Sequence, residues 1–237
     1  MAKLNGGKKK RLHNCMDVNV AIKYIRQHIE LFGAEIYTFT DDTYNNKPDN
    51  HAIPHDSLNN FKASIENCEK CNLSLTRNKF VFGSGDPDAD LMLIGEGPGK
   101  EEDSKGEPFV GQAGKLLDKI LKAIGYVRYD NVFIANIVKC RPPENRNPLP
   151  SEIEKCTPYL KDQINLIKPK LIVALGKVAG QTLLNENMLI KEMRKKTHRY
   201  NSIPLIITYH PAALLRNPSL KLDVWEDFQY IRDFMKS

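Results

Sequence analysis

Four cysteines have a spacing that suits one metal centre. Cys68 and Cys71 form a C-x-x-C pair on one turn, and Cys140 and Cys156 can complete a four-thiolate set from a distant part of the chain. Soft thiolate ligands favour an iron-sulfur cluster or zinc, and the spacing alone does not decide between these two. A redox dithiol is a further interpretation of the C-x-x-C pair. It is disfavoured because no strand-turn-helix pattern of the thioredoxin type surrounds Cys68.

The segment 141–150 lies between the last two of these cysteines and contains four prolines. This proline content is incompatible with a packed helix or a central strand. Ordering a long irregular loop costs conformational entropy, and a metal that ties its ends would offset that cost. The alternative is a proline-rich surface loop with incidental cysteines. Cys15 stands apart from the set, and a buried free thiol is its expected role.

A glycine-rich stretch, Gly95–Gly99, could hold a flat ligand. It matches neither G-x-G-x-x-G nor a P-loop, and four acidic residues between positions 96 and 103 would repel a pyrophosphate. Glycines let a ligand approach backbone N–H groups closely, and Phe109 follows shortly with an aromatic face. This combination suits a nucleobase. Taken alone, however, the stretch is more typical of an ordinary strand-to-helix turn beside a core phenylalanine.

Short apolar runs predict the strands that position these residues. The runs lie at 91–94, 132–135, 171–174 and 204–207, and each is nearly continuous, as expected for strands buried on both faces of a parallel sheet. Helical patterns lie between and after them, at 114–124, 151–167, 177–185 and 220–235. This alternation predicts an α/β fold, a three-layer α/β/α sandwich with a central four-stranded, mainly parallel sheet. Ligands of such sheets bind beyond the carboxyl ends of the strands, where Asn136 and Tyr209-His210-Pro211 follow.

The first 56 residues are expected to form a separate part of the chain. Apolar residues at helical spacing predict an amphipathic helix over 17–32 that ends at Gly33, and the Asn- and Pro-containing segment 38–56 predicts a linker. We therefore expect an N-terminal tail, helix and linker at 1–56 and a main domain at 57–237.

The overall composition is that of a soluble globular protein. Of the 237 residues, 41% are hydrophobic and 27% charged, and no apolar stretch approaches the roughly 20 residues of a membrane helix. No secretory signal pattern opens the chain, which favours a reducing compartment. The net charge of +6 comes largely from five basic residues among the first twelve, so it supports a nucleic-acid partner only weakly. A second basic cluster, 191–199, could face a phosphate backbone or form a solvated loop.

Four motifs together resemble those of the iron-sulfur uracil-DNA glycosylases (family 4 type) of bacteria and archaea. They are Gly95-Glu-Gly-Pro-Gly-Lys-Glu-Glu-Asp103, Gly106-Glu-Pro-Phe-Val-Gly-Gln-Ala-Gly114, Asn136-Ile-Val-Lys-Cys-Arg-Pro-Pro143 and His210-Pro-Ala-Ala-Leu-Leu-Arg216. The resemblance extends from about Asn67 to the C-terminus. It implies a 4Fe-4S cluster on Cys68, Cys71, Cys140 and Cys156, uracil-containing DNA as the partner, a monomer without membrane association, and a bacterial or archaeal cytosol as the location.

The resemblance also implies roles for individual pocket residues. Glu96 would act in catalysis by placing the water and, with Gly97 and Pro98, would shape the pocket. Phe109 would stack on the flipped base. Glu102 would crowd the position where thymine carries its methyl group.

The other implied roles concern the base edge and the duplex. Asn136 would pair with the imide edge of uracil, and His210 would donate to the carbonyl oxygen that gains charge. The wedge into the duplex would consist of Leu214, Leu215 and Arg216. Ala213 departs from the family, which often has an aromatic residue there, so the space beside the wedge is filled differently.

The chemistry of uracil excision requires residues of these types. The base must leave the duplex for a fitted pocket, and the amide of Asn136 matches the N–H and C=O of uracil, whereas cytosine presents the reverse order. A donor such as His210 stabilises the developing uracil anion. No motif lysine suggests a Schiff base, so we expect a monofunctional glycosylase of base excision repair that leaves an abasic site. Without the motifs, a turn-capping role for Asn136 stays plausible as the lesser alternative, and a lone histidine before a proline, such as His210, is more often structural than catalytic.

Three other hypotheses remain open at this point. The chain could be a DNA-binding or polymerase-associated module with this fold and cluster but no activity, although the intact pocket residues argue against that. It could be an enzyme that becomes trapped covalently on DNA, but the region 139–147 lacks the histidine expected for such an enzyme. It could also be a zinc-binding structural protein.

Overall fold

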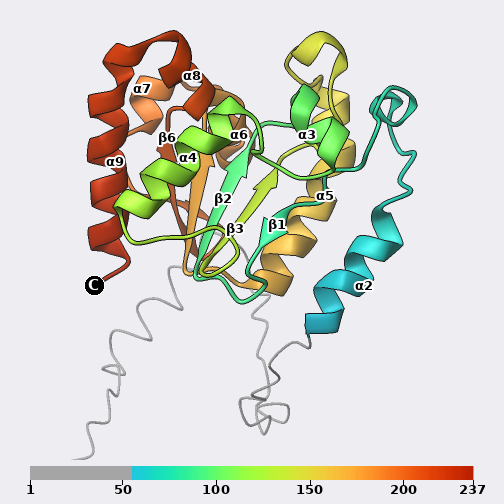
Figure 1. The fold of residues 1–237 in the computed structure, drawn as a ribbon, viewed down its shortest axis with the longest axis horizontal. Coiled ribbons are helices and arrows are strands. Elements are labelled where there is room, and N and C mark those ends of the chain that lie inside the picture. Colours follow the sequence, from blue (N-terminus) through green and yellow to red (C-terminus); the bar gives the residue numbers. More distant parts are fainter. Residues whose placement is uncertain (1–54, 237) are drawn as a thin grey trace, which may run out of the picture. The chain divides into compact units, whose positions relative to one another are not determined.

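The computed structural model describes residues 55–236 of the chain (Figure 1). The predicted helix at 17–32, Cys15 and the basic tail lie outside these residues. The first described helix, α2, begins at His55, two residues before the predicted start of the main domain. The division of the chain into 1–56 and 57–237 stays a prediction.

A mixed sheet of six strands forms the centre of the described region, in the order β1-β3-β2-β4-β6-β5. The predicted α/β class is confirmed, and so are the four parallel strands, but a four-stranded sheet is wrong. Two short antiparallel strands form the edges, and they contain only two and three residues, too few to show an apolar run. The strands are β1 (Ser84–Gly85), β2 (Leu91–Gly95), β3 (Val132–Asn136), β4 (Leu171–Leu175), β5 (His198–Tyr200) and β6 (Ile203–Thr208).

The four predicted helices form with small shifts at their ends, at 112–123, 150–167, 177–184 and 221–234, and the described region has four further helices that were not predicted. Proline at the first position suits α5, because its fixed φ fits a helix start and no amide hydrogen is needed there. The Glu152 carboxylate accepts from the Leu149 N–H at 2.7 Å and so caps the same end. The helices are α2 (His55–Ile65), α3 (Lys100–Lys105), α4 (Gln112–Ala123), α5 (Pro150–Ile167), α6 (Lys177–Leu184), α7 (Ile190–Met193), α8 (Pro211–Arg216) and α9 (Lys221–Phe234), with 3-10 turns η2 (Asn72–Leu75), η3 (Pro143–Asn145) and η4 (Pro218–Leu220).

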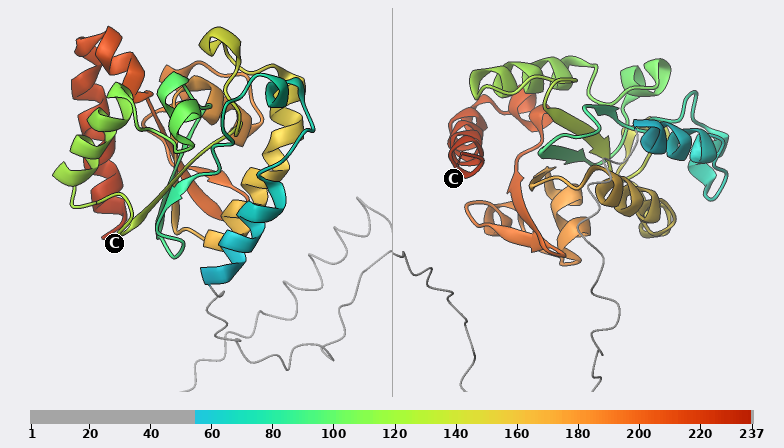
Figure 2. Two further views of the ribbon diagram at one scale, coloured as in Figure 1. Left: turned by 45° about the vertical axis from the view of Figure 1, so that its right-hand side comes forward. Right: turned by 90° about the horizontal axis from the view of Figure 1, so that it is seen from below.

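Helices cover both faces of the sheet (Figure 2). Two apolar cores, one on each face, hold the three layers together. Side chains alternate along β2, so that Leu91 and Leu93 face one core while Met92 and Ile94 face the other. Helices α4, α8 and α9 supply the first core, and α2, α5 and α6 supply the second. Each fully buried leucine or phenylalanine contributes roughly 1.5–3 kcal/mol from burial.

The parallel register brings the loops that follow the strands side by side. Gly95 pairs with Asn136, so β2 and β3 end at the same level. Backbone bonds continue beyond the strand ends, since the N–H groups of residues 137 and 138 donate to the carbonyls of Gly95 and Glu96 at 2.9 and 3.1 Å. Chemical groups that follow these strands therefore meet at one edge of the sheet. Within residues 55–236, no helix combines the length and apolar character needed to cross a membrane.

Candidate active site

A cavity of about 560 Å³ opens at the carboxyl ends of the four parallel strands. Each strand contributes to its lining: Glu96 follows β2, Asn136 ends β3, Gly176 follows β4 and His210 follows β6. The volume suits a small-molecule ligand, and the position is the one where open α/β sheets bind ligands.

Most of the residues predicted for the site lie in this cavity. Those that line it are Glu96, Gly97, Pro98, Glu102, Phe109, Asn136, His210 and Arg216. The two leucines of the predicted wedge do not line the cavity, and they differ in exposure. Leu214 is buried in the core, with 2% of its surface exposed, whereas Leu215 is 50% exposed.

Phe109 and Asn136 converge on Gly95 at the floor of the cavity. A Cβ atom at Gly95 would lie 2.5 Å from the Asn136 Oδ1 and 2.7 Å from the Phe109 ring, so only glycine leaves room for both side chains. The rings of Phe109 and His210 lie 5.3 Å apart between centroids. Asn136 is 2% exposed, and its Oδ1 has no hydrogen-bond partner within the described part of the chain. A buried acceptor without a partner is costly, and here it lines a cavity that a ligand can enter.

The backbone at Phe109 is strained and is held from two sides. Its φ of 54° lies in the left-handed region, which costs a non-glycine residue about 1–3 kcal/mol. The Glu102 carboxylate accepts from the N–H groups of Val110 and Gly111, both at 2.9 Å. The Arg128 guanidinium donates to the carbonyls of Pro108 at 2.7 Å and Phe109 at 2.8 Å. These contacts fix the aromatic ring in the cavity.

The contacts of Glu102 and Arg128 with the Phe109 turn were not predicted from the sequence. Glu102 was predicted to crowd a methyl group; its carboxylate also has a positioning contact with the Phe109 turn. Arg128 carried no signal in the sequence, because it lies outside every motif and its contacts depend on the folded chain. Its side chain is 8% exposed and pairs with Asp118 at 3.0 Å.

His210 has a defined tautomer. The N–H of Ala212 donates to its Nδ1 at 3.1 Å, so a neutral ring carries its hydrogen on Nε2. The pKa of His210 is lowered to about 4, mainly by burial and also by the positive charge of Arg216, while Glu102 opposes the shift. The imidazole is therefore neutral at pH 7. Glu96 responds in the opposite direction, since burial raises the pKa of its carboxyl above the ordinary value.

The turn that carries His210 is held by a buried ion pair. Thr208, two residues earlier, donates to Asp227 on α9 at 2.6 Å. Arg194 donates to the same carboxylate at 2.8 and 3.1 Å, and its guanidinium lies 4.5 Å from the centroid of the Tyr209 ring. Arg194 belongs to the basic cluster 191–199 and has 5% of its surface exposed, so it is a structural residue, whereas the other Lys and Arg side chains of that cluster are exposed.

The proline-rich loop forms one wall of the cavity. Pro142 and residues 145–147 line it. Arg146 fixes the loop to α5 through two bonds to Glu152, at 2.7 and 2.9 Å, and this hydrogen bonding lowers the pKa of the Glu152 carboxyl. Arg146 and Lys177 add positive charge to the lining. Nothing in the sequence singled out these two residues, because their place at the rim follows from the fold.

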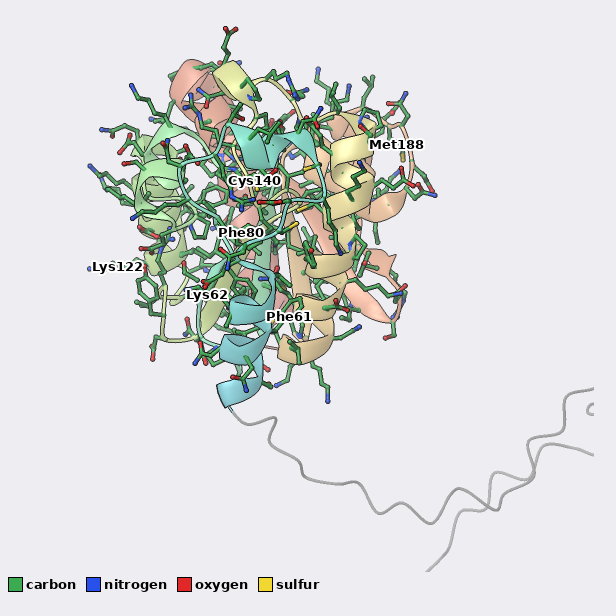
Figure 3. All side chains as sticks on the ribbon, turned by 90° about the vertical axis from the view of Figure 1, so that its right-hand side faces the viewer. Phe61, Lys62, Phe80, Lys122, Cys140 and Met188 are labelled. Carbon is green, nitrogen blue, oxygen red and sulfur yellow. The ribbon has the colours of Figure 1, made fainter. Side chains whose placement is uncertain are left out.

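The cysteine corner consists of Cys68, Cys71, Cys140 and Cys156, of which Cys140 is labelled in Figure 3. The pKa of the Cys140 thiol is raised to about 11, mainly by burial and in smaller part by nearby Cys156 and Cys71, while the Arg77 guanidinium opposes the shift. Burial likewise raises the pKa of Cys156, with Cys71 and Cys68 among the contributing neighbours. The fold thus gathers thiols from three distant segments.

Hydrogen-bond donors surround the sulfur atoms of this corner. Arg77 donates to the Cys140 Sγ at 3.2 Å, and the Tyr159 hydroxyl donates to the Cys68 Sγ at 3.3 Å. The backbone N–H of Lys139 donates to the Cys156 Sγ at 3.3 Å. Such donors favour negatively charged sulfur. Among residues 55–236, no three His, Cys, Asp or Glu side chains are arranged to hold a single metal ion.

Fold and cavity together define an α/β protein with a ligand site at the carboxyl edge of a parallel sheet. The model of the uracil DNA glycosylase superfamily matches residues 82–229. The chain is 45% identical to the type-4 uracil-DNA glycosylase of Sulfurisphaera tokodaii, over 75% of this chain and 84% of that protein. It is 42% identical to the type-4 enzyme of Archaeoglobus fulgidus, over 74% and 92% of the two chains, and 41% identical to that of Thermotoga maritima, over 73% and 91%. The chain belongs to the uracil DNA glycosylase superfamily.

Proposed function

We propose that this protein hydrolyses the N-glycosidic bond of uracil in DNA and leaves an abasic site. The observation that carries the proposal is the unpartnered Oδ1 of Asn136, which is buried at the floor of the cavity beside the Phe109 and His210 rings. The imide N–H of uracil is a donor that would satisfy this oxygen. The identity to type-4 uracil-DNA glycosylases supports the same activity.

Base selection follows from the Asn136 amide and from the Phe109 turn. The amide offers an acceptor and a donor side by side, which complement uracil and oppose the reversed pattern of cytosine. Phe109 stacks on the flipped base. Glu102 helps hold the Phe109 turn and so limits the space for a thymine methyl group.

Bond cleavage uses His210 and Glu96. When the bond between the sugar and the base breaks, its electron pair moves into uracil and the sugar becomes oxocarbenium-like. The neutral His210 donates its Nε2 hydrogen to the carbonyl oxygen that gains charge, and it does so without a proton transfer. The Glu96 carboxylate orients a water that adds to the sugar carbon and accepts its proton. The uracil anion then takes up a proton from solvent while Glu96 releases the proton that it accepted, so the products are an abasic sugar and free uracil, with no covalent intermediate on the protein.

The duplex is opened by exposed residues at the rim. Leu215 and Arg216, at the end of α8, are exposed and are suited to enter the space that the extruded base leaves. We restrict the proposed wedge to these two residues because Leu214 packs in the core.

We further propose that Cys68, Cys71, Cys140 and Cys156 hold a 4Fe-4S cluster. The chemistry of the donor set supports such a group, because the buried thiols of Cys140 and Cys156 have cysteines of the C-x-x-C segment as electrostatic neighbours, and N–H and O–H donors point at the sulfurs. The cluster supplies structural cross-linking of the chain. The cysteines tie the start of the proline-rich loop and α5 to the segment after α2, and this fixes one wall of the cavity.

The test of activity uses a duplex with one uracil, incubated with the full chain and then treated with alkali. We expect strand breakage at the uracil only after alkali, and no breakage of duplexes that carry thymine or cytosine at that position. An unbroken uracil strand would contradict the activity and favour a DNA-binding module. Elemental analysis of the same sample tests the cofactor, where zinc in place of iron would contradict the cluster.

A further inference from the structure

Lys139 has a fully buried side chain between the cavity and the cysteine corner. It belongs to the short segment that runs from Asn136, at the end of β3, to Cys140. One end of this segment lines the cavity and the other end supplies a thiol of the corner. The proposed chemistry on uracil does not use this lysine.

The ammonium group of Lys139 reaches back along its own segment. Its Nζ donates to the carbonyl oxygen of Asn136 at 2.8 Å and also to the Oε1 of Gln163 on α5. The side-chain nitrogen of Gln163 donates to the carbonyl of Phe82 at 2.9 Å, which turns its oxygen toward the lysine. The amine is thus fixed by two neutral acceptors, and one of them is the backbone of the residue proposed to read uracil.

A buried cation needs a negative partner, since removal of its charge from water is costly. No ion pair within residues 55–236 provides a carboxylate for Lys139. Its backbone N–H instead donates to the Cys156 Sγ at 3.3 Å. Burial lowers the pKa of the Lys139 ammonium to about 8, and a negative charge on Cys156 opposes that shift. Four thiolates that bind an iron-sulfur cluster give it a net negative charge, which suits a cation in this position.

We infer that Lys139 is a positioning residue that couples the cysteine corner to the substrate pocket. Its ammonium is the counter-ion of the cysteine-bound cluster and at the same time holds the carbonyl of Asn136. This inference rests on the proposed function. It explains how a cluster outside the cavity affects uracil recognition: loss of the cluster leaves the buried cation without its partner and releases Asn136.

The test is Lys139→Met in the full chain with its iron, because methionine keeps the apolar stem and removes the charge. We expect the reduction potential of the cluster to become more negative, since a neighbouring positive charge favours the added electron. We expect single-turnover uracil release to fall roughly 10- to 100-fold, as is typical when a partner behind a ligand is removed. The control is Lys155→Met, an exposed lysine beside Cys156, which should leave both values unchanged.

A second variant separates charge from hydrogen bonding. Gln163→Leu keeps the ammonium but removes one of its acceptors, so we expect the wild-type potential together with slower uracil release. Wild-type release by both variants, or slower release by Lys139→Met at an unchanged potential, would overturn the inference. If Lys139→Met does not fold, wild-type release by Gln163→Leu would still overturn it.

These outcomes are distinct from failure of the proposed function. A wild-type protein without iron would overturn the cluster and the coupling together. A wild-type protein that contains iron and excises uracil, with a Lys139→Met variant that behaves in the same way, would overturn the coupling alone.

Discussion

Two turns bring functional rings into the same cavity, and each is supported by a buried arginine from elsewhere in the chain. Arg128 donates directly to the carbonyl of Phe109. Arg194 acts at a greater distance from His210, because it binds Asp227, which in turn accepts from Thr208. The two turns also differ in their backbones. Phe109 has a φ of 54°, whereas His210 has ordinary extended angles of −65° and 137°.

The difference shows what each ring requires from the protein. A stacking ring needs only a position, and a strained backbone supplies it when contacts from other elements hold the strain. The histidine needs a defined protonation state and tautomer, and the Ala212 N–H supplies the tautomer from within the turn. Loss of the Arg128 contacts at the Phe109 turn should therefore reduce mainly activity. Loss of the contact between Arg194 and Asp227 at the His210 turn should reduce mainly stability.

The largest effect on uracil release is expected for substitution of His210 itself. His210→Ala removes the donor to the developing anion, so we expect single-turnover release of uracil to fall about 100- to 1000-fold, as when one oxyanion donor is removed. His198→Ala on the edge strand is the control and should retain near-normal release. Near-normal release by His210→Ala would contradict the role of the imidazole.

A smaller effect is expected at Phe109. Phe109→Ala removes base stacking, which is worth about 1–3 kcal/mol per base, so we expect a loss of roughly 10- to 100-fold in kcat/KM. Phe109→Tyr keeps the ring and should stay close to wild type. If the alanine variant releases uracil normally, the proposed stacking is wrong.

Arg128 should affect uracil release only by positioning the Phe109 ring. Arg128→Met leaves the strained turn without one of its two clamps, and we expect about a tenfold loss in kcat/KM, comparable to one hydrogen bond to a charged group. In a Phe109→Ala background the same substitution should have little further effect, because the ring it positions is gone. Additive losses would contradict positioning, and Lys122→Met, an exposed change on α4, is the control.

The features that could be predicted from the sequence are those that depend on a local pattern of residues. Continuous apolar runs predict the four parallel strands, and the motifs predict the residues that meet in the cavity. The edge strands β1 and β5 are too short to show a pattern. Arg128, Arg194 and Lys139 escape prediction for another reason: their contacts join residues that are brought together only by the fold, as when Arg194 meets Asp227 across 33 positions. Leu214 illustrates the same limit, since its burial depends on packing against the core.

Asp227→Asn tests the support of the His210 turn. It leaves Arg194 buried without a full counter-charge, so we expect about 3–5 kcal/mol less stability. Because the Ala212 N–H still sets the tautomer, release measured where the variant is folded should change less than in Arg128→Met. Urea unfolding and single-turnover assays check the two parts. A larger loss of activity than in Arg128→Met would contradict the proposed difference between the turns.

The smallest expected effect is that of pH on the rate of uracil release, which should show no step from titration of His210. Glu96→Gln removes the pocket carboxyl whose pKa is raised by burial, so a step left between pH 6 and 8 would belong to His210. Its pKa of about 4 keeps the imidazole neutral throughout, and we expect a flat release rate. A step near the ordinary value of about 6.5 would contradict the neutral donor.

The lowered pKa of His210 also affects stability. The folded state binds fewer protons than the unfolded state between about pH 4 and 6.5, so stability should fall as the pH drops through that window. His210→Ala should remove this part of the acid sensitivity, because the cost arises from a ring that must stay neutral in the fold.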